Sequence, residues 1–515
     1  MPDYMFLLES RLSPEQHALL ERVQELARSQ DLNLYLTGGA VRDLISGQPI
    51  RDLDFTVEGN PVRMVRELEK GGAKIVTESE RLRYYEMVFA GDVDGSIAAA
   101  RDDVYSHPGA KPEVRFAGIT EDLRRRDFSI NAIAISLNVQ SRGLLLDPTN
   151  GLADLERQEV RALSIHAFTN RPIRLIRILR YCARMGFKME SRTQEWFDLA
   201  LQRGLHEKMD AAEVGEEIRA LTREENPIAT LKLWESQGLL DKISSELQRR
   251  KPDYDSLNKL ARVRGNLLSA GLRPRLQVPV AYYLFSRLKP KEAAAAMREL
   301  QFRPMEMEAI AELVPEAQKI VQVLKGRKTN TPREAYAYIS SLRAEMIAFI
   351  EVELPSPPVL SKFRNYFQKW RPLRSSLPVN ELSALGIPRG PQFDKIMEQI
   401  FEVQLRGRAR TPEERVKIFR QLAGIKDEPV KKPEKEKKKR KELDSAELSK
   451  SAGAKSTNVK QPAADLGHSA AEAIGAKARA KHDKAATAAH AASKHGPSTG
   501  SKSKAKPAAK KSRTR

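Results

Sequence analysis

Two aspartates are the first residues whose type and spacing suggest chemistry. Asp52 and Asp54 lie in the string RDLDF, where residues 53–57 have the apolar character of a strand. Residues two apart on a strand point to the same face of the sheet, so these carboxylates could share a metal site. Hard oxygen ligands on one face suit Mg²⁺ bound together with a nucleoside triphosphate. Two such ions could activate a hydroxyl group and stabilise a departing pyrophosphate.

A pair of glycines precedes the aspartates. Gly38 and Gly39 stand in LTGGAVRD, between a predicted strand and a predicted helix that also carries Arg42. Glycines at such a turn let the backbone approach a phosphate closely, and the helix behind them presents free N–H groups. A diglycine turn or an Asp-x-Asp pair alone is common. Joined at this spacing, they favour a nucleotide site over a chance match.

A second polar group, RRDFSINA, occupies residues 125–132. Arg125 and Arg126 supply multidentate cationic donors that suit phosphate oxygens. Asp127 could accept a hydrogen bond from a ribose hydroxyl, and Asn131 adds an amide for sugar or phosphate. An isolated Arg-Arg-Asp is more often a surface cluster of ion pairs. Because RRDFSINA follows the diglycine and aspartate motifs in order along the chain, the nucleotide interpretation is preferred.

Five arginines recur at three- and four-residue intervals just after residue 170. That spacing places them in one stripe along a helix, with Leu175, Ile176, Leu179 and Ala183 on the buried side. A stripe of this kind can be only a solvated face, but beside a metal site we expect a nucleotide or RNA surface. The arginines are Arg171, Arg174, Arg177, Arg180 and Arg184.

The elements that must position these residues form a mixed α/β region followed by helices. Residues 13–16 look like a helix start, because Ser-Pro-Glu-Gln combines a capping residue with a proline. Strands are predicted at 34–37, 53–57, 84–90, 96–101 and 130–137. Beyond residue 150 the apolar residues follow helical spacing, most clearly over 173–185, 211–221 and 228–236. The expected class is therefore α+β.

Length and charge bound the organisation of the chain. Its 515 residues exceed one compact core, so two to four domains are expected. Residues 427–515 hold 23 Lys and Arg against 10 Asp and Glu, which is 13 of the net charge of +21. This segment is rich in Lys and Ala and nearly lacks aromatics, so it is predicted to be disordered. It could add RNA affinity or serve solubility alone.

The cysteine content and the distribution of apolar residues bear on the compartment in which the protein works. The single cysteine, Cys182, excludes an intrachain disulfide and a cysteine-based zinc site. The first residues lack the basic and apolar pattern of a signal peptide, and no apolar run approaches a membrane span. A cytoplasmic location, without membrane contact, is predicted.

Taken together, the motifs resemble the bacterial class of the tRNA CCA-adding enzyme and poly(A) polymerase family. The resemblance rests on GGAVRD with RDLDF, on RRDFSINA, on Asp147-Pro148 with Gly151, on RLIRILRYCARMGF, and on LGIPRGP with QLRG near residue 400. It covers residues 34–424 in order and leaves out the basic tail. It implies a polymerase-beta-like nucleotidyltransferase head domain over 1–150, a helical neck over 151–250 and a helical body and tail over 251–426.

The resemblance also implies a function. A template-independent RNA nucleotidyltransferase would add CCA, or part of it, to tRNA 3′ ends from CTP and ATP, using two Mg²⁺ ions. Addition of A alone to varied RNAs and an inactive RNA-binding relative are the alternatives. Asp52 and Asp54 would be catalytic and hold the metal. Nucleotide would be bound by Gly38, Gly39, Arg42, Arg125, Arg126, Asp127, Asn131, Arg171, Arg174 and Arg177, and RNA by Arg180, Arg184 and Arg389.

Two positions depart from the family pattern. CCA-adding members carry Glu-Asp-x-x-Arg to read the incoming base, and here residues 170–174 keep Arg174 but have Arg171 in place of the acid. Arginine only donates hydrogen bonds, so we expect altered or relaxed base choice unless Asp210 or Glu213 enters the pocket. The second departure is Ser96, where relatives often have an acid; Asp94 is the nearest carboxylate.

Overall fold

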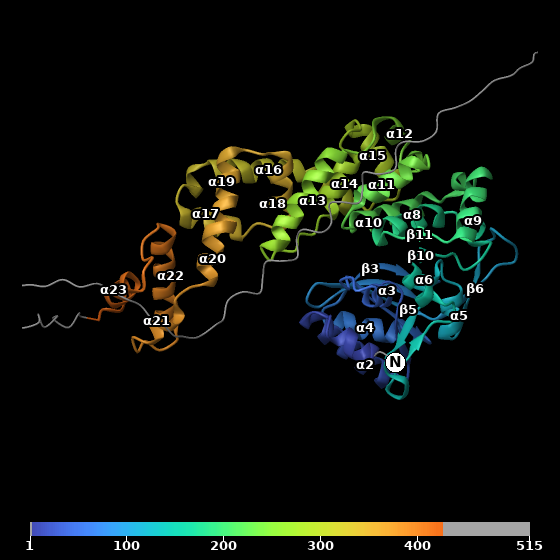
Figure 1. The fold of residues 1–515 in the computed structure, drawn as a ribbon, viewed down its shortest axis with the longest axis horizontal. Coiled ribbons are helices and arrows are strands. Elements are labelled where there is room, and N and C mark those ends of the chain that lie inside the picture. The colour runs from blue at the N-terminus through green and yellow to red at the C-terminus, as the bar shows by residue number, and fades with distance from the viewer. Residues whose placement is uncertain (1–2, 426–515) are drawn as a thin grey trace, which may run out of the picture. The chain divides into compact units, whose positions relative to one another are not determined.

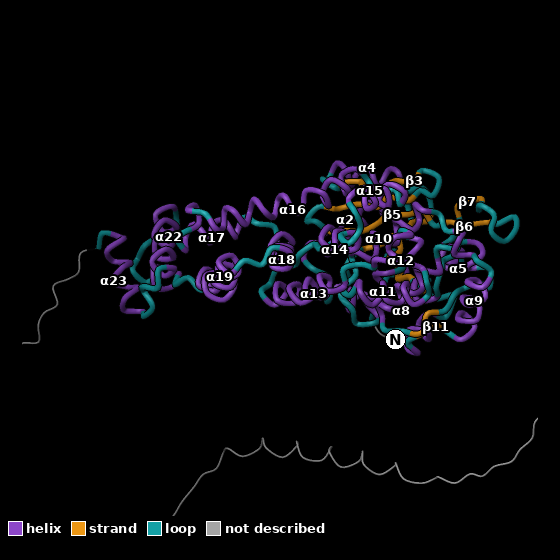
Figure 2. The backbone as a smooth tube through the Cα atoms, turned by 90° about the horizontal axis from the view of Figure 1, so that it is seen from above, coloured by secondary structure: helices purple, strands orange, loops and turns teal. Residues whose placement is uncertain are grey.

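The computed structural model describes residues 3–425 (Figure 1). The chain divides into two units after Glu428, and all described residues lie in the first. The predicted disordered tail over 427–515 lies outside the described residues. Within residues 3–425 a mixed sheet is followed by a nearly all-helical part, so the expected α+β class is confirmed (Figure 2).

The head is built on a seven-stranded sheet with the strand order β3-β4-β5-β2-β1-β8-β9. β2 pairs in parallel with β5, whereas the other neighbours are antiparallel. This parallel pair places Asp54 opposite Ser96 near the middle of the sheet. The strands are β1 (Asn33–Thr37), β2 (Leu53–Glu58), β3 (Lys74–Ser79), β4 (Tyr84–Phe89), β5 (Val93–Ala99), β8 (Ala134–Ser136) and β9 (Leu145–Leu146).

Helices pack on this sheet and supply its core. The predicted helix start at Ser13 is a capping box, in which the Ser13 hydroxyl accepts from the Gln16 backbone N–H and the Gln16 side chain accepts from that of Ser13. The buried face of this helix includes Val23 and Leu26. The helices of the head are α1 (Tyr4–Glu9), α2 (Pro14–Ser29), α3 (Gly39–Ile45), α4 (Val62–Lys70) and α5 (Ile119–Arg124).

Two predicted strands differ from the structure. The strand expected over 96–101 divides into β5, which ends at Ala99, and β6 (Arg101–Val104), which leaves the main sheet to pair with β7 (Glu113–Phe116). The strand expected over 130–137 begins instead with a 3-10 turn (Ser129–Asn131), and only Ala134–Ser136 is extended. The turn directs the Asn131 amide towards Arg42, 2.6 Å away, a tertiary contact that apolar alternation does not signal.

The helical part confirms the three helices predicted most clearly, now α8, α10 and α11. Gly186 ends α8 in the left-handed conformation at φ 68°. None of the described helices is long and apolar enough to cross a bilayer. The helices are α6 (Gly151–Arg157), α7 (Ala167–Asn170), α8 (Arg174–Met185), α9 (Ser191–Gln202), α10 (Ala211–Thr222), α11 (Pro227–Ser236), α12 (Ser245–Arg250), α13 (Tyr254–Ser269), α14 (Gln277–Phe285), α15 (Pro290–Glu299), α16 (Pro304–Lys325), α17 (Pro332–Ser340), α18 (Ala344–Glu353), α19 (Pro357–Asn365), α20 (Arg371–Ser375), α21 (Val379–Ser383), α22 (Pro391–Leu405) and α23 (Pro412–Ala423).

Candidate active site

The two aspartates converge on the diglycine turn. Asp54 is the second residue of β2, whereas Asp52 precedes the strand instead of lying on it as the sequence predicted. A Cβ placed on Gly39 would lie 3.8 Å from Asp54 Oδ2 and 4.0 Å from Asp52 Oδ1. Both carboxylates therefore face the same space beside Gly39, although the strand period alone does not bring them there.

Negative charge is concentrated at this pair. Burial and the charge of Asp52 raise the pKa of Asp54 to about 7, against the opposing effects of Ser96, Arg126 and Arg42. The Ser96 hydroxyl lies 2.6 Å from Asp54 Oδ1 and donates to it. A carboxylate whose pKa is raised by burial and by a neighbouring carboxylate favours a bound cation, because the cation compensates the negative charge.

The diglycine turn also brings Arg126 to the carboxylates. Gly38 has φ 68°, and a Cβ added there would lie 3.1 Å from Arg126 Nη1 and 4.0 Å from Asp54 Oδ2. A side chain at Gly38 would therefore fill the space between that cation and the acid. Arg126 is held in place by Asp122, at 2.8 Å, and by the backbone carbonyl of Asn131, at 3.2 Å.

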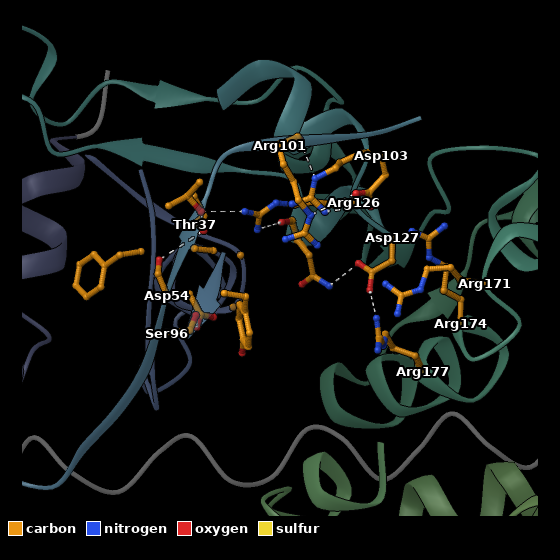
Figure 3. A pocket seen from close by; sticks show the side chains of 18 of the residues that line it. Thr37, Asp54, Ser96, Arg101, Asp103, Arg126, Asp127, Arg171, Arg174 and Arg177 are labelled. Carbon is orange, nitrogen blue, oxygen red and sulfur yellow. Dashed lines mark hydrogen bonds and ion pairs between the residues drawn. The ribbon is translucent and has the colours of Figure 1, made fainter. Parts of the chain in front are cut away.

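A cavity of about 290 Å³ opens in front of this turn (Figure 3). Its walls come from the turn, from β2, β4 and β5, from the segment around residue 126, and from α8 together with Arg171, which precedes it. Most of the residues predicted to bind nucleotide line it, although Arg42 does not. The lining residues are Thr37, Gly38, Gly39, Asp54, Phe55, Thr56, Tyr84, Ser96, Ala98, Arg101, Asp103, Arg125, Arg126, Asp127, Asn131, Arg171, Arg174, Arg177 and Tyr181.

Asp127 and Arg177 form the ionised centre of the far wall, 3.1 Å apart. Burial alone would raise the pKa of Asp127, but Arg177 and Arg174 outweigh it and lower that pKa to about 2. Asp127 Oδ1 also accepts from the backbone N–H of Phe128 and, at 3.3 Å, from the Asn131 amide. Asp127 thus stays ionised across the physiological range.

Two further arginines of this wall differ in their partners. Arg171 forms an ion pair with Glu213, so one of the two acids considered from the sequence does contact the residue that replaces the family's acid. Arg174 is buried, its Nη1 donates to the backbone carbonyl of Ala167 at 3.3 Å, and its Nε has no hydrogen-bond partner. An unsatisfied buried donor on a cavity wall is suited to a ligand's acceptor atom.

Alternating acids and arginines, joined at one point by Asn131, form a closed ring, here called the charged ring; Asp127, Arg177 and Asn131 also line the cavity. Each member contacts the next at 2.5–3.8 Å, except Arg184 and Asp43, whose ion pair is closer still. Arg180 also stacks over the ring of Tyr181, with 4.7 Å to its centroid. In order, the charged ring runs through Asp127, Arg177, Glu217, Arg180, Glu224, Arg184, Asp43, Arg42 and Asn131 and returns to Asp127.

The charged ring corrects three of the sequence assignments. Arg180 is buried, and Glu217 and Glu224 occupy its guanidinium, so an RNA contact by this side chain does not fit. The Arg184 guanidinium likewise forms an ion pair with Asp43. Arg42 is 2% exposed and reaches Asn131 instead of the cavity. Four arginines of the predicted stripe lie on α8, whereas Arg171 precedes this helix, and acids distant in the sequence neutralise Arg180 and Arg184.

The remaining assignments are simpler to place. Arg125 lines the cavity and is paired with Asp122. Arg389 is exposed in the segment between α21 and α22 and does not line the cavity, so its RNA contact stays a prediction. Among the described residues, no group of three or more His, Cys, Asp or Glu side chains could hold a metal ion, and Asp94 therefore does not complete such a group.

Sequence reasoning missed several residues. Tyr84, Arg101 and Asp103 line the cavity but belong to no motif. Glu217 and Glu224 complete the charged ring; Glu217 lies on α10 and Glu224 in the turn after it, and no motif in the sequence signals their partners.

A larger groove of about 510 Å³ adjoins the cavity. The side chains of Tyr84, Arg101, Arg171 and Arg177 line both the cavity and the groove, so the two adjoin at these residues. Arg219, Arg223 and Arg303 add further cations to the groove, with Glu86, Glu216 and Glu306 as its acids. Acids outside the lining pair three of the six arginines of the groove: Asp103 with Arg101, Glu213 with Arg171, and Glu217 with Arg177.

Comparison with known proteins identifies the head. Residues 34–161 match the poly A polymerase head domain. The chain is 24% identical to an A-adding tRNA nucleotidyltransferase of Geobacter sulfurreducens, over 82% of this chain and 48% of that protein. It is 34% identical to the A-adding enzyme of Halalkalibacterium halodurans over 44% of this chain and 53% of the relative. A CC-adding tRNA nucleotidyltransferase of Deinococcus radiodurans is 34% identical over 34% of this chain and 47% of its own length.

These matches confirm the resemblance to tRNA nucleotidyltransferases that the motifs indicated. The chain spans about half the length of the curated relatives it matches. The head-domain match covers the diglycine turn, the aspartate pair and the segment around Asp127, but not the neck arginines.

Proposed function

We propose that this protein adds nucleotides to the 3′ end of RNA, with tRNA as the substrate and CTP and ATP as donors. Pyrophosphate leaves in each step. The observation that carries the proposal is the convergence of Asp52, Asp54 and Arg126 on the diglycine turn, at one end of a cavity whose other end is lined by arginines. The cytoplasm remains the predicted compartment.

The donor set fits a hard divalent cation. Asp52 and Asp54 offer carboxylate oxygens, and the raised pKa of Asp54 reflects negative charge that a cation would compensate. Two carboxylates leave room for phosphate oxygens and water to complete the coordination. We propose Mg²⁺, in two sites that share Asp52 and Asp54. Bound there, it would lower the pKa of the attacking hydroxyl and stabilise charge on the leaving pyrophosphate.

The cavity suggests how a nucleotide is held. The triphosphate would lie against Gly38 and Gly39, and Arg126 would bind its oxygens. A Cβ at Gly38 would crowd Arg126 Nη1 at 3.1 Å, and one at Gly39 would occupy the space beside the carboxylates. Asp127 would accept a ribose hydroxyl. The base would then reach Arg171 and Arg174 on the neck side of the cavity.

The groove beside the cavity would receive the RNA terminus. It shares Tyr84, Arg101, Arg171 and Arg177 with the nucleotide cavity, and six arginines line it in all. Guanidinium groups suit phosphate oxygens, and neutralisation of phosphates releases counterions. Arg389, exposed in the helical part, remains a proposed RNA contact farther along the chain.

The choice of base is a separate matter. Glu213 holds Arg171, and no acid at the reading position lines the cavity, so strict selection of C and then A by the family's usual geometry is not expected. Addition of only the terminal A of CCA to tRNA is supported by the likeness to A-adding tRNA nucleotidyltransferases, and A addition to varied RNAs is the second candidate.

Single-nucleotide incorporation tests the proposal. Purified protein would be incubated with Mg²⁺, with labelled CTP or labelled ATP, and with tRNA ending before CCA, after C or after CC. Label from both nucleotides supports CC and A addition, and label from ATP alone supports addition of A, either as the terminal residue of CCA or to varied RNAs. Asp52→Ala should abolish incorporation. Absence of incorporation by the wild-type protein on all three tRNAs and on unstructured RNA would leave the inactive RNA-binding alternative.

A further inference from the structure

The segment that leads into Asp52 is held by residues far away in the chain. Arg51 donates through Nη1 to the backbone carbonyl of Arg223 at 2.7 Å and through Nη2 to Glu224 Oε2 at 3.0 Å. Both ends of its guanidinium are thus bound by the turn that follows α10. Asp52 precedes Leu53, the first paired residue of β2, so the ladder of the sheet does not define its position.

The Glu224 carboxylate, which binds Arg51, is itself fixed by its surroundings. Only 4% of its side chain is exposed; its second oxygen accepts from Arg180 Nη1 at 3.0 Å, and Arg184 Nε lies 3.8 Å from Oε2. Burial would raise the pKa of Glu224, but Arg180, Arg184 and Arg51 together lower it, so the carboxylate is ionised. A buried charge with three cationic neighbours has little freedom to move.

The neighbouring residue, Arg223, contacts the same sheet at a second point. Its Nη2 lies 3.1 Å from Glu86 Oε1 on β4. Glu86 is opposite Ser96 across β4 and β5, and Ser96 is opposite Asp54 across β5 and β2. Ser96 also donates to Asp54. Arg223 and Glu224 therefore bind Arg51, which precedes Asp52. Arg223 also binds Glu86, which lies in the same cross-strand row as Ser96 and Asp54.

We propose that Glu224 is a positioning residue of the metal site, acting through Arg51 to keep Asp52 beside Asp54. The inference deepens the proposed function and rests on it. No group of three potential metal-binding side chains exists among the described residues, so metal affinity depends on the mutual placement of only two carboxylates. A residue that orients such a ligand typically contributes ten- to hundredfold in metal affinity.

Mn²⁺ binding to the whole chain tests the inference without catalysis. Free Mn²⁺ would be measured by electron paramagnetic resonance in the presence of ATP and absence of RNA. Glu224→Gln keeps the shape and removes the charge, and we expect it to weaken Mn²⁺ binding about tenfold or more. The Mg²⁺ concentration for half-maximal incorporation should rise similarly. KM for the nucleotide at saturating Mg²⁺ should stay near the wild-type value.

Arg51→Gln is the second variant, needed because a buried Glu224 change could prevent folding. Arg51 is partly exposed, at 28%, and its loss leaves Glu224 with two other arginines. If Glu224 acts through Arg51, the double variant should bind Mn²⁺ no more weakly than Glu224→Gln alone. Glu316→Gln removes the same charge from an exposed pair with Arg343 and should change nothing.

Two results would overturn the inference. One is wild-type Mn²⁺ affinity in a folded Arg51→Gln protein; the other is strictly additive losses in the double variant, which would mean independent action. Failure of the proposed function would look different: the wild-type protein itself would incorporate no nucleotide, whereas its Mn²⁺ binding would remain measurable and comparable among the variants.

Discussion

At the scale of single residues, the site is defined by which charges have partners. Arg177 and Arg180 are saturated by acids of the charged ring, and Arg171 is paired with Glu213. Arg174 keeps an unsatisfied Nε on the cavity wall, and Asp54 carries a carboxyl with an elevated pKa. Arg174 therefore has an unused hydrogen-bond donor, and Asp54 has negative charge that a bound cation would compensate.

Asp54→Asn should inactivate the protein while stabilising its metal-free form. Because the pKa of Asp54 is raised to about 7 in the folded state, the folded protein holds this proton more tightly than the unfolded chain. Ionisation thus costs stability progressively from about pH 4, and fully above about pH 7. We expect Asp54→Asn to gain about 1–3 kcal/mol in unfolding free energy at pH 8 and almost nothing at pH 4.

Denaturant unfolding in EDTA at both pH values measures the effect, and Mg²⁺ should shrink the difference at pH 8 by stabilising the wild type. An Asp54→Asn protein less stable than wild type at pH 8 in EDTA would contradict the assigned repulsion.

Arg174→Lys should raise KM for the nucleotide about tenfold or more, because lysine keeps the charge but lacks the planar, multidentate guanidinium of this cavity-lining residue. The loss of one charge-assisted hydrogen bond corresponds to about 1.5–3 kcal/mol. Initial rates at saturating RNA measure it, with Arg298→Lys on the exposed face of α15 as the matched control. Equal KM values for the two variants would remove Arg174 from the nucleotide site.

At the scale of elements, α8 joins the head to the helices by charge as well as by apolar packing. Its buried side chains include Leu175, Ile176 and Leu179. Its arginines reach α10, the turn after α10, and Asp43 on α3. Because acids of neighbouring elements pair with the arginines of α8, the cationic side of this helix is largely buried and is not a solvated face.

Arg180→Ala should therefore act on stability and leave RNA affinity unchanged. Removing one partner of a buried ion-pair network leaves Glu217 and Glu224 undercompensated, which costs about 3–5 kcal/mol. Chemical denaturation measures the loss, and RNA binding by filter retention, well below the melting temperature, should stay within about twofold of wild type because the side chain is buried. A large loss of RNA affinity with unchanged stability would restore Arg180 as an RNA contact.

At the scale of the whole molecule, positive charge is unevenly distributed along the chain. Residues 427–515 contribute 13 of the net +21, and among the described residues six arginines line the groove that adjoins the cavity. The tail lies outside the described residues, so its contribution to RNA binding follows from its composition alone. Polyanion affinity built on many lysines depends steeply on salt.

Deletion of residues after Asp427 should weaken RNA binding and flatten its dependence on salt, with nucleotide incorporation at saturating RNA unchanged. Each phosphate that the tail no longer neutralises lowers the slope of log affinity against log salt by about 0.7–0.9. Titrations from low to physiological salt measure the slope. A full-length variant with the tail lysines replaced by glutamine separates charge from length. An unchanged slope in both would assign the tail to solubility.

Local spacing determined much of this protein from its sequence. The diglycine turn, the capping box at Ser13 and helix α8 each depend on residues close together in the chain, where turn chemistry and helical period apply. The likeness to tRNA nucleotidyltransferases followed from the order of such motifs, and the comparisons confirm it.

Only the tertiary structure decided which arginines are available. Whether a guanidinium faces ligand or acid depends on partners tens of residues away, as Glu217 and Glu224 are from Arg180. The same holds for Asp52, which reaches Asp54 from outside the strand, and for Arg51, whose anchors lie at residues 223 and 224. Charge compensation acts through space, and sequence periodicity records only which side of a helix a residue occupies.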